Sequence, residues 1–234
     1  MFTFTSCAQE KNTTGSDILK KAKGIFNKNN GGGLSNDEII AGLKEALSVG
    51  AQNSSSKLSA VDGFFANAAI KVLMPEEAKK VESTLRNVGL GNMVDKAILS
   101  MNRAAEEAAK SAAPIFIDAI KSMSIQDAVG ILRGSDTAAT SYLKGKTTIG
   151  LTNAFKPVIE TALEKTNATK YWKDVFETYN KLPTTFNKVN TDLSGYVTEK
   201  ALSGIFYQVA LEEKDIRKNP AARVTDILKK VFGS

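Results

Sequence analysis

Eight polar side chains stand out because they interrupt otherwise apolar helical segments of the sequence. Amide, carboxylate, hydroxyl and guanidinium groups at such positions either pair with one another or bind a ligand. Because the planar fork of arginine suits carboxylate and phosphate groups, the functional interpretation is a pocket that holds an anion. The candidate residues are Asn102, Arg103, Glu106, Asp127, Thr140, Glu213, Arg217 and Arg223.

The spacing of these residues also supports a structural interpretation. Glu106 lies four residues before Lys110. Glu213 lies four residues before Arg217. Opposite charges at this spacing meet on one face of a helix and stabilise it by about 0.2–0.5 kcal/mol per pair. We favour this interpretation, in which the polar residues stabilise helices and hold them together, and keep the anion pocket as the alternative.

The composition of the chain excludes several common kinds of site. With no histidine and one cysteine in 234 residues, a single chain cannot assemble a His/Cys zinc site, a Ser-His or Cys-His nucleophile pair, or a disulfide framework. The 31 basic and 25 acidic residues are dispersed, unlike the basic stripe typical of a nucleic-acid binder. We expect no metal, no cofactor and no nucleic-acid partner.

The elements that position the candidate residues are predicted to be helices. The central one covers residues 99–123, where six of the ten residues from Ala104 to Ala113 are alanine. Alanine is the best helix former and has a small side chain. We therefore expect neighbouring helices to approach this segment closely and bury it. Pro114 predicts either a kink or a new helix start within it.

Capping residues and glycines divide the rest of the chain into further helices. They are predicted after a capping box at residues 35–38, over 76–88, from a cap at 124–127, from a cap at Asp136, over 151–165, over 170–179, over 201–210 and from 219–220. Residues 70–73 are predicted to be extended, because they precede Pro75. The predicted fold class is all-α, a single-domain bundle of about ten helices around the alanine-rich central helix.

Residues 190–197 resemble the start of an EF-hand calcium loop, with alternating oxygen donors and a glycine at the sixth position. The twelfth position is Ala201, where such a loop needs a bidentate glutamate. We therefore favour Asp192, Ser194 or Thr198 as helix-capping residues.

The N-terminal sequence MFTFTSC ends in the one cysteine, Cys7, and a polar stretch follows it. It resembles the end of a bacterial lipoprotein signal, in which small residues precede the lipid-bearing cysteine. A complete signal has a charged start and an apolar region of about 7–15 residues. Residues 1–15 are interpreted as a signal remnant and tether, and residues 16–234 as the helical domain. A free cysteine near the terminus is the alternative.

Several motifs from about Ser16 to the C-terminus occur in an order and spacing shared with one bacterial family. They comprise residues 34–35 with 42–47, 102–106, Met123 with 127–128 and 131–132, Thr140 with Tyr142, 196–202, 213–223 and 231–233. In these motifs the chain resembles the family catalogued as domain of unknown function 4197. The resemblance implies a helical protein of Gram-negative bacteria that is usually made with an export signal. This chain contains only a short part of such a signal. It implies no activity and no catalytic residues.

Two functions of different classes follow. We favour an exported, non-catalytic protein of the cell envelope, lipid-anchored through Cys7 on the periplasmic side or at the outer membrane. It would bind a protein partner, or an apolar or amphiphilic ligand between its helices. The alternative is a carboxylate-based hydrolase or lyase, with Glu106 and Glu213 in an arginine-lined anion pocket. An apolar cavity larger than about 300 Å³ favours the first.

Overall fold

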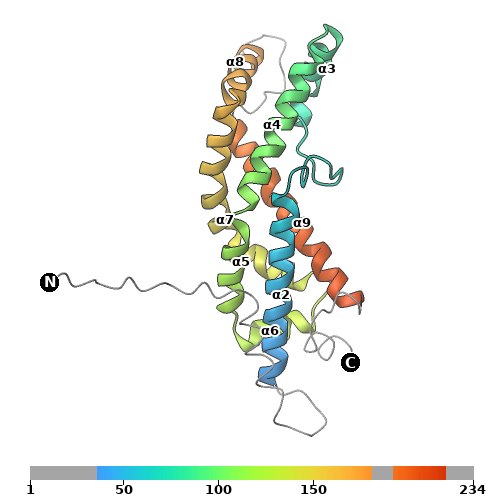
Figure 1. The fold of residues 1–234 in the computed structure, drawn as a ribbon, viewed down its shortest axis with the longest axis vertical. Coiled ribbons are helices and arrows are strands. Elements are labelled where there is room, and N and C mark those ends of the chain that lie inside the picture. The colour runs from blue at the N-terminus through green and yellow to red at the C-terminus, as the bar shows by residue number, and fades with distance from the viewer. Residues whose placement is uncertain (1–35, 181–191, 220–234) are drawn as a thin grey trace, which may run out of the picture. The chain divides into compact units, whose positions relative to one another are not determined.

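The computed structural model describes residues 36–180 and 192–219 (Figure 1). The chain divides into a unit Met1–Leu34 and a larger unit Ser35–Ser234, and every described residue belongs to the second. All regular secondary structure in the described residues is helical, which confirms the all-α fold class. The elements are α2 (Asn36–Ser59), the 3-10 helix η1 (Glu76–Ala78), α3 (Lys79–Asn87), α4 (Gly91–Ala109), α5 (Ala112–Lys121), α6 (Ile125–Leu132), α7 (Ala138–Lys165), α8 (Ala168–Asn180) and α9 (Leu193–Lys218).

The alanine-rich segment lies in the core, as predicted. Helix α4 packs on α2, α7 and α9 (Figure 1). The small side chains allow these helices to approach α4 closely, since a larger residue would hold them apart. The alanines that are completely buried are Ala104, Ala105, Ala108, Ala109 and Ala112.

The predicted central helix is two helices. Helix α4 ends at Ala109 and α5 begins at Ala112, so Pro114 lies in the first turn of α5. Proline is tolerated there because the first backbone N–H groups of a helix have no intrahelical acceptor. The sequence left open whether Pro114 kinks one helix or starts a new one, and in the structure it lies at the start of a new helix.

Helix α7 is longer than predicted. It runs without interruption over 28 residues and contains Pro157, where the sequence predicted separate helices. Four of its threonine hydroxyls donate back to main-chain carbonyls four residues earlier: Thr147 to Leu143, Thr148 to Lys144, Thr152 to Thr148 and Thr161 to Pro157. Its length allows α7 to pack on α4, α5, α6, α8 and α9.

Helix α9 is the surface on which α2, α4 and α7 pack. Gly204 is needed on this helix because any side chain there would collide with the buried Phe64 ring. The edge-to-face contact of Phe206 with Phe116 of α5, with ring centroids 5.9 Å apart, joins a further helix to this core.

Within residues 36–180 and 192–219, every helix is too short or too polar to cross a lipid bilayer. Several sequence predictions fall outside these residues. They are the signal remnant with Cys7, the start of the capping box at Ser35, the last helix from residues 219–220, and Arg223.

Candidate functional site

The sequence candidates on α4 hold the segment between α2 and η1. Asn102 is completely buried. Its Oδ1 accepts a hydrogen bond from the Val72 N–H at 2.9 Å, and its Nδ2 donates to the Val72 and Ile98 carbonyls at 2.8 Å. One amide side chain therefore satisfies both main-chain polar groups of Val72, which is buried and lies outside any helix.

Glu106 and Arg103 hold the same segment one helical turn further along. Oε1 of the buried Glu106 accepts from the N–H groups of Phe64 and Phe65 at 3.1 and 3.2 Å. Its Oε2 accepts from Arg103 at 2.6 Å, and Arg103 also donates to Asp62 at 2.6 Å. These hydrogen bonds raise the pKa of the Arg103 guanidinium. We call Asp62, Asn102, Arg103 and Glu106 the α4 polar cluster.

Helix α9 holds this segment from a second direction. The Tyr196 hydroxyl donates to the Leu73 carbonyl at 2.7 Å. Burial raises the pKa of Tyr196 to about 12, and the acidic side chains of Glu77 and Glu199 act in the same direction. Adjacent residues 72 and 73 are therefore bonded to two different helices.

The candidates on α7 and α9 form a second group, which we call the α9 polar cluster: Thr140, Glu213 and Arg217. The buried Glu213 carboxylate accepts from the N–H groups of Ala139 and Thr140, at 3.0 and 2.8 Å, and from the Thr140 hydroxyl at 2.8 Å. It thereby caps the first turn of α7, where a negative charge also interacts favourably with the helix dipole.

Arg217 completes the α9 polar cluster. Its guanidinium donates to Glu213 at 2.9 and 3.1 Å and to the Ile131 carbonyl at 2.9 Å. Ile131 belongs to α6, so Arg217 and Glu213 together connect α6, α7 and α9. The pairing also compensates the charge of a carboxylate that is almost completely buried.

The structure corrects the predicted cap of α7. Asp136 was expected to cap this helix, but the residue before its first turn is Thr137, and no local side chain makes the capping bond. Asp136 instead pairs with Lys218 of α9 at 2.6 Å, and that hydrogen bond lowers its pKa. The cap comes from Glu213, 73 residues away from Thr140 in the sequence.

The predicted cap of α6 is confirmed. Asp127 and Ser124 form a reciprocal capping box, in which each side chain accepts from the main-chain N–H of the other. The hydrogen bonds from Ser124 lower the pKa of Asp127. Asp192 likewise caps α9, where it accepts from the Gly195 N–H at 2.9 Å.

The two carboxylates of the enzyme alternative, Glu106 and Glu213, belong to different clusters with no common partner. Glu106 accepts three hydrogen bonds and Glu213 accepts five, so both are occupied by protein donors. Among the described residues, no group of three or more acidic or cysteine side chains is placed to hold a metal ion. The geometry of both clusters is that of groups that fix main-chain segments and helix ends.

The structure contains a cavity, away from both polar clusters, that the sequence did not predict. It has a volume of about 450 Å³, and its described walls come from Met74 before η1, from α3 and the turn after it, from α4 and α8, and from the start of α9. We call it the α3–α8 pocket. None of the eight candidates is among the described residues that line it. The apolar side chains that dominate its walls include Met74, Leu85, Met93, Met101, Trp172 and Phe176.

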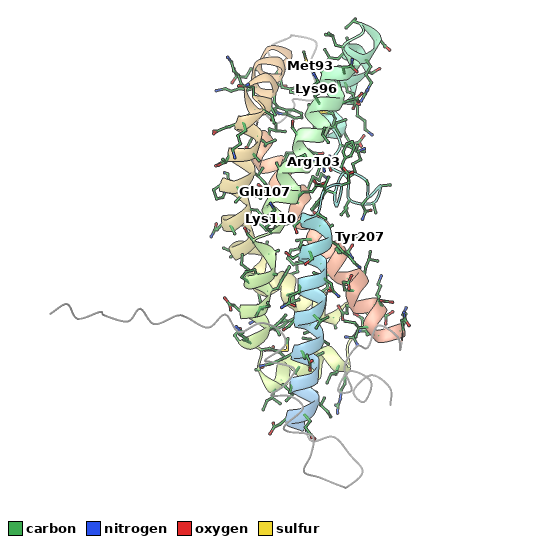
Figure 2. All side chains as sticks on the ribbon, in the orientation of Figure 1. Met93, Lys96, Arg103, Glu107, Lys110 and Tyr207 are labelled. Atoms are coloured by element: carbon green, nitrogen blue, oxygen red, sulfur yellow. The ribbon has the colours of Figure 1, made fainter. Side chains whose placement is uncertain are left out.

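Among the described lining residues of the α3–α8 pocket, two have charged side chains, Glu82 from α3 and Lys96 from α4. Figure 2 shows Met93 and Lys96 near the start of α4, with Arg103, Glu107 and Lys110 farther along the helix. The sequence signal was the recurrence of Met93, Ala97 and Met101 at four-residue intervals on one face of α4. Such a stripe is indistinguishable from a helix face that packs in a filled core.

Comparison with known proteins agrees with the resemblance found in the sequence. The family model for the protein of unknown function DUF4197 matches residues 33–233. No curated protein and no solved structure matches the chain. Since the family match spans the helical region containing both polar clusters and the α3–α8 pocket, the chain belongs to the DUF4197 family of proteins of unknown function.

Proposed function

We propose that this protein is a non-catalytic binding module that holds an apolar or amphiphilic small molecule in the α3–α8 pocket. The observation that carries the proposal is the pocket itself. Its volume of about 450 Å³ falls in the range of about 300–1,000 Å³ that is typical of small-molecule sites. A concave, apolar site with few polar groups suits a ligand with a substantial hydrocarbon part.

The polar residues support binding rather than catalysis. A catalytic carboxylate needs an accessible oxygen and a substrate within reach. Glu106 and Glu213 are buried, and their oxygens accept hydrogen bonds from main-chain N–H groups and arginines. Their role in the proposal is to hold the loop and the helix ends that keep the bundle in one arrangement.

The proposal places the module in the cell envelope, attached through a lipid on Cys7. Its support is the short apolar sequence before Cys7, the polar tether after it, and the export signal implied by the family resemblance. Cells that express the chain from its native gene should incorporate labelled palmitate into the protein. Cys7→Ser should abolish the label, and label retained in that variant contradicts the anchor.

Binding can be measured with the protein's own fluorescence, because Trp172 is the one tryptophan in the chain and lines the pocket. Bromine quenches tryptophan fluorescence on close contact. We expect ω-bromododecanol, titrated below its solubility limit, to quench Trp172 in a saturable way. Native mass spectrometry of protein purified from its own host would show the natural occupant as a bound mass.

A variant that fills the pocket provides the specific test. Ala97→Phe places a ring in the α3–α8 pocket, and steric conflict of about 1–3 kcal/mol corresponds to binding weaker by about 5- to 150-fold. Ala41→Phe is the matched control, since Ala41 is exposed on α2 and is not a described lining residue. Absence of saturable quenching in the unmodified protein, or equal affinity in both variants, refutes the proposal.

A further inference from the structure

We propose that the α3–α8 pocket selects single-chain amphiphiles with an anionic head group, and that Lys96 pairs with this head group. The inference rests on the proposed function, because it names the class of ligand for the same pocket. The head group would be a carboxylate or a phosphate, two chemistries that an ammonium group binds in the same way.

The exposure of the lining residues divides the pocket into a buried end and a mouth. Met101 and Val94 are 0% and 1% exposed, whereas Met93 and Leu90 are 49% and 43% exposed. All four line the pocket. A hydrocarbon chain is therefore stabilised at the buried end, while a polar group at the mouth remains in contact with water.

Lys96 lies where the head group of such a ligand would be. It follows Met93 by one helical turn on α4 and precedes Ser100 by another, and all three line the pocket. Its side chain is exposed, so the ammonium can reach the mouth while the methylene stem covers apolar wall. A head group bound there stays partly hydrated, as expected for a site at a pocket mouth.

The charged groups near the mouth differ in whether other described residues pair with them. Glu82, the other charged lining residue, is paired with Arg86 at 2.9 Å. Hydrogen bonds to Asp95 and Glu82 raise the pKa of Arg86. Lys96, in contrast, has no ion pair or hydrogen bond with any residue of the described ranges. Among the described lining residues, Lys96 is thus the charged side chain left to pair with a ligand.

The test is competition against ω-bromododecanol, with recovery of Trp172 fluorescence as the signal. The competitors have the same chain and differ in the head: dodecanoate, dodecyl phosphate, dodecanol and dodecyltrimethylammonium. A partly exposed ion pair contributes about 0.2–1 kcal/mol, so the two anions should displace the reporter at concentrations about 1.4- to fivefold lower than dodecanol. The preference should decrease as salt is added.

Charge variants separate the role of Lys96 from a structural effect. Lys96→Gln should remove the preference for anions, and Lys96→Glu should favour dodecyltrimethylammonium over dodecanoate. Lys110→Gln is the control, because Lys110 lies at the other end of α4 and outside the described lining (Figure 2). Circular dichroism establishes that each variant is folded.

The outcomes distinguish the inference from the proposed function. If ω-bromododecanol binds but anions compete no better than dodecanol, or the Lys96→Glu variant keeps the original order, the role of Lys96 is refuted and the pocket stands as an apolar site. If the reporter does not bind, both proposals fail. A preference of dodecyl phosphate over dodecanoate indicates a phosphate head group, and the opposite order a fatty acid; either supports the inference.

Discussion

Replacing Glu213 by alanine should destabilise the protein more than any other single loss of a charge in the bundle. The substitution removes the cap of α7 and leaves the N–H groups of Ala139 and Thr140 without their acceptor. It also removes the ion pair of Glu213 with Arg217, whose side chain is only 12% exposed. Loss of an N-cap alone costs about 0.5–2 kcal/mol, and breaking a buried ion pair costs about 3–5 kcal/mol.

Because these effects act at one place they are not additive, and we take about 3–5 kcal/mol as the total. For a chain of this size the corresponding fall in melting temperature is roughly 6–20 °C. Glu213→Gln should lose less than Glu213→Ala, since the amide oxygen can still accept one of the main-chain hydrogen bonds. The assay is urea and thermal unfolding followed by circular dichroism.

The matched control is Glu199→Ala, an exposed glutamate on the same helix. Surface substitutions of this kind change stability by about 0.5 kcal/mol or less. A loss smaller than about 1 kcal/mol for Glu213→Ala, below the usual net value of hydrogen bonds to a charged group, contradicts the capping role. That result would make Glu213 and Arg217 candidates for ligand binding again.

The remaining predictions concern four other positions. Asn102→Ala should cost about 1–3 kcal/mol in urea unfolding, because it leaves the polar groups of buried Val72 unpaired; an unchanged midpoint contradicts this. Ala108→Leu should lower the free energy of unfolding by about 1–3 kcal/mol, because the larger side chain overpacks the buried face of α4. A neutral result would show that the neighbouring helices can move apart. The pKa of Asp127 is lowered from 3.8, so its ionised form stabilises the folded state above that pH and the contribution is lost as the pH falls below it. In the Asp127→Asn variant, the melting temperature should therefore decrease less as the pH falls than it does in the unmodified protein. The pKa of Tyr196 is raised from 10.0 to about 12, so stability should fall between pH 10 and about 12 as the unfolded chain loses this proton first. Tyr196→Phe should remove that part of the alkaline decrease in chemical unfolding, and an identical decrease in both proteins would refute it.

Local signals in the sequence predicted the helices whose ends are determined by neighbouring residues. The capping box of α6 lies within four residues. Gly89 adopts a positive φ of 83° just after α3, as expected of a glycine that ends a helix. The burial of the alanines between positions 104 and 112 followed from side-chain size, because small residues at successive turns permit such close packing.

Signals that depend on tertiary partners were misjudged. Residues 52–59 are mostly polar, a composition typical of a loop, yet α2 extends to Ser59. The buried Ser54 and Ser55 hydroxyls donate to the Gly50 and Ala109 carbonyls, at 2.7 Å each. Serine favours turns when it is exposed to water, and the sequence contains no indication that α4 supplies an acceptor.

The candidate residues were correctly selected as polar groups inside helices that need partners, but their partners could not be read from the sequence. Glu106 and Lys110 were expected to pair, whereas Lys110 pairs with Glu107 and Glu106 accepts from residues 64 and 65. The α3–α8 pocket was missed for a related reason. Hydrophobic periodicity identifies a buried face and contains no measure of the space left between two such faces.

The position of α9 near the C-terminal end of the described chain has a consequence for biosynthesis. Ribosomes deliver the chain from its N-terminus at about 5–20 residues per second, so α2, α4 and α7 emerge before the helix on which all three pack. Until Glu213 has been translated, the first turn of α7 lacks its acceptor. A nascent chain interrupted before Leu193 thus lacks the helix that covers the apolar faces of α2, α4 and α7, and the native core can form only after α9 has been translated.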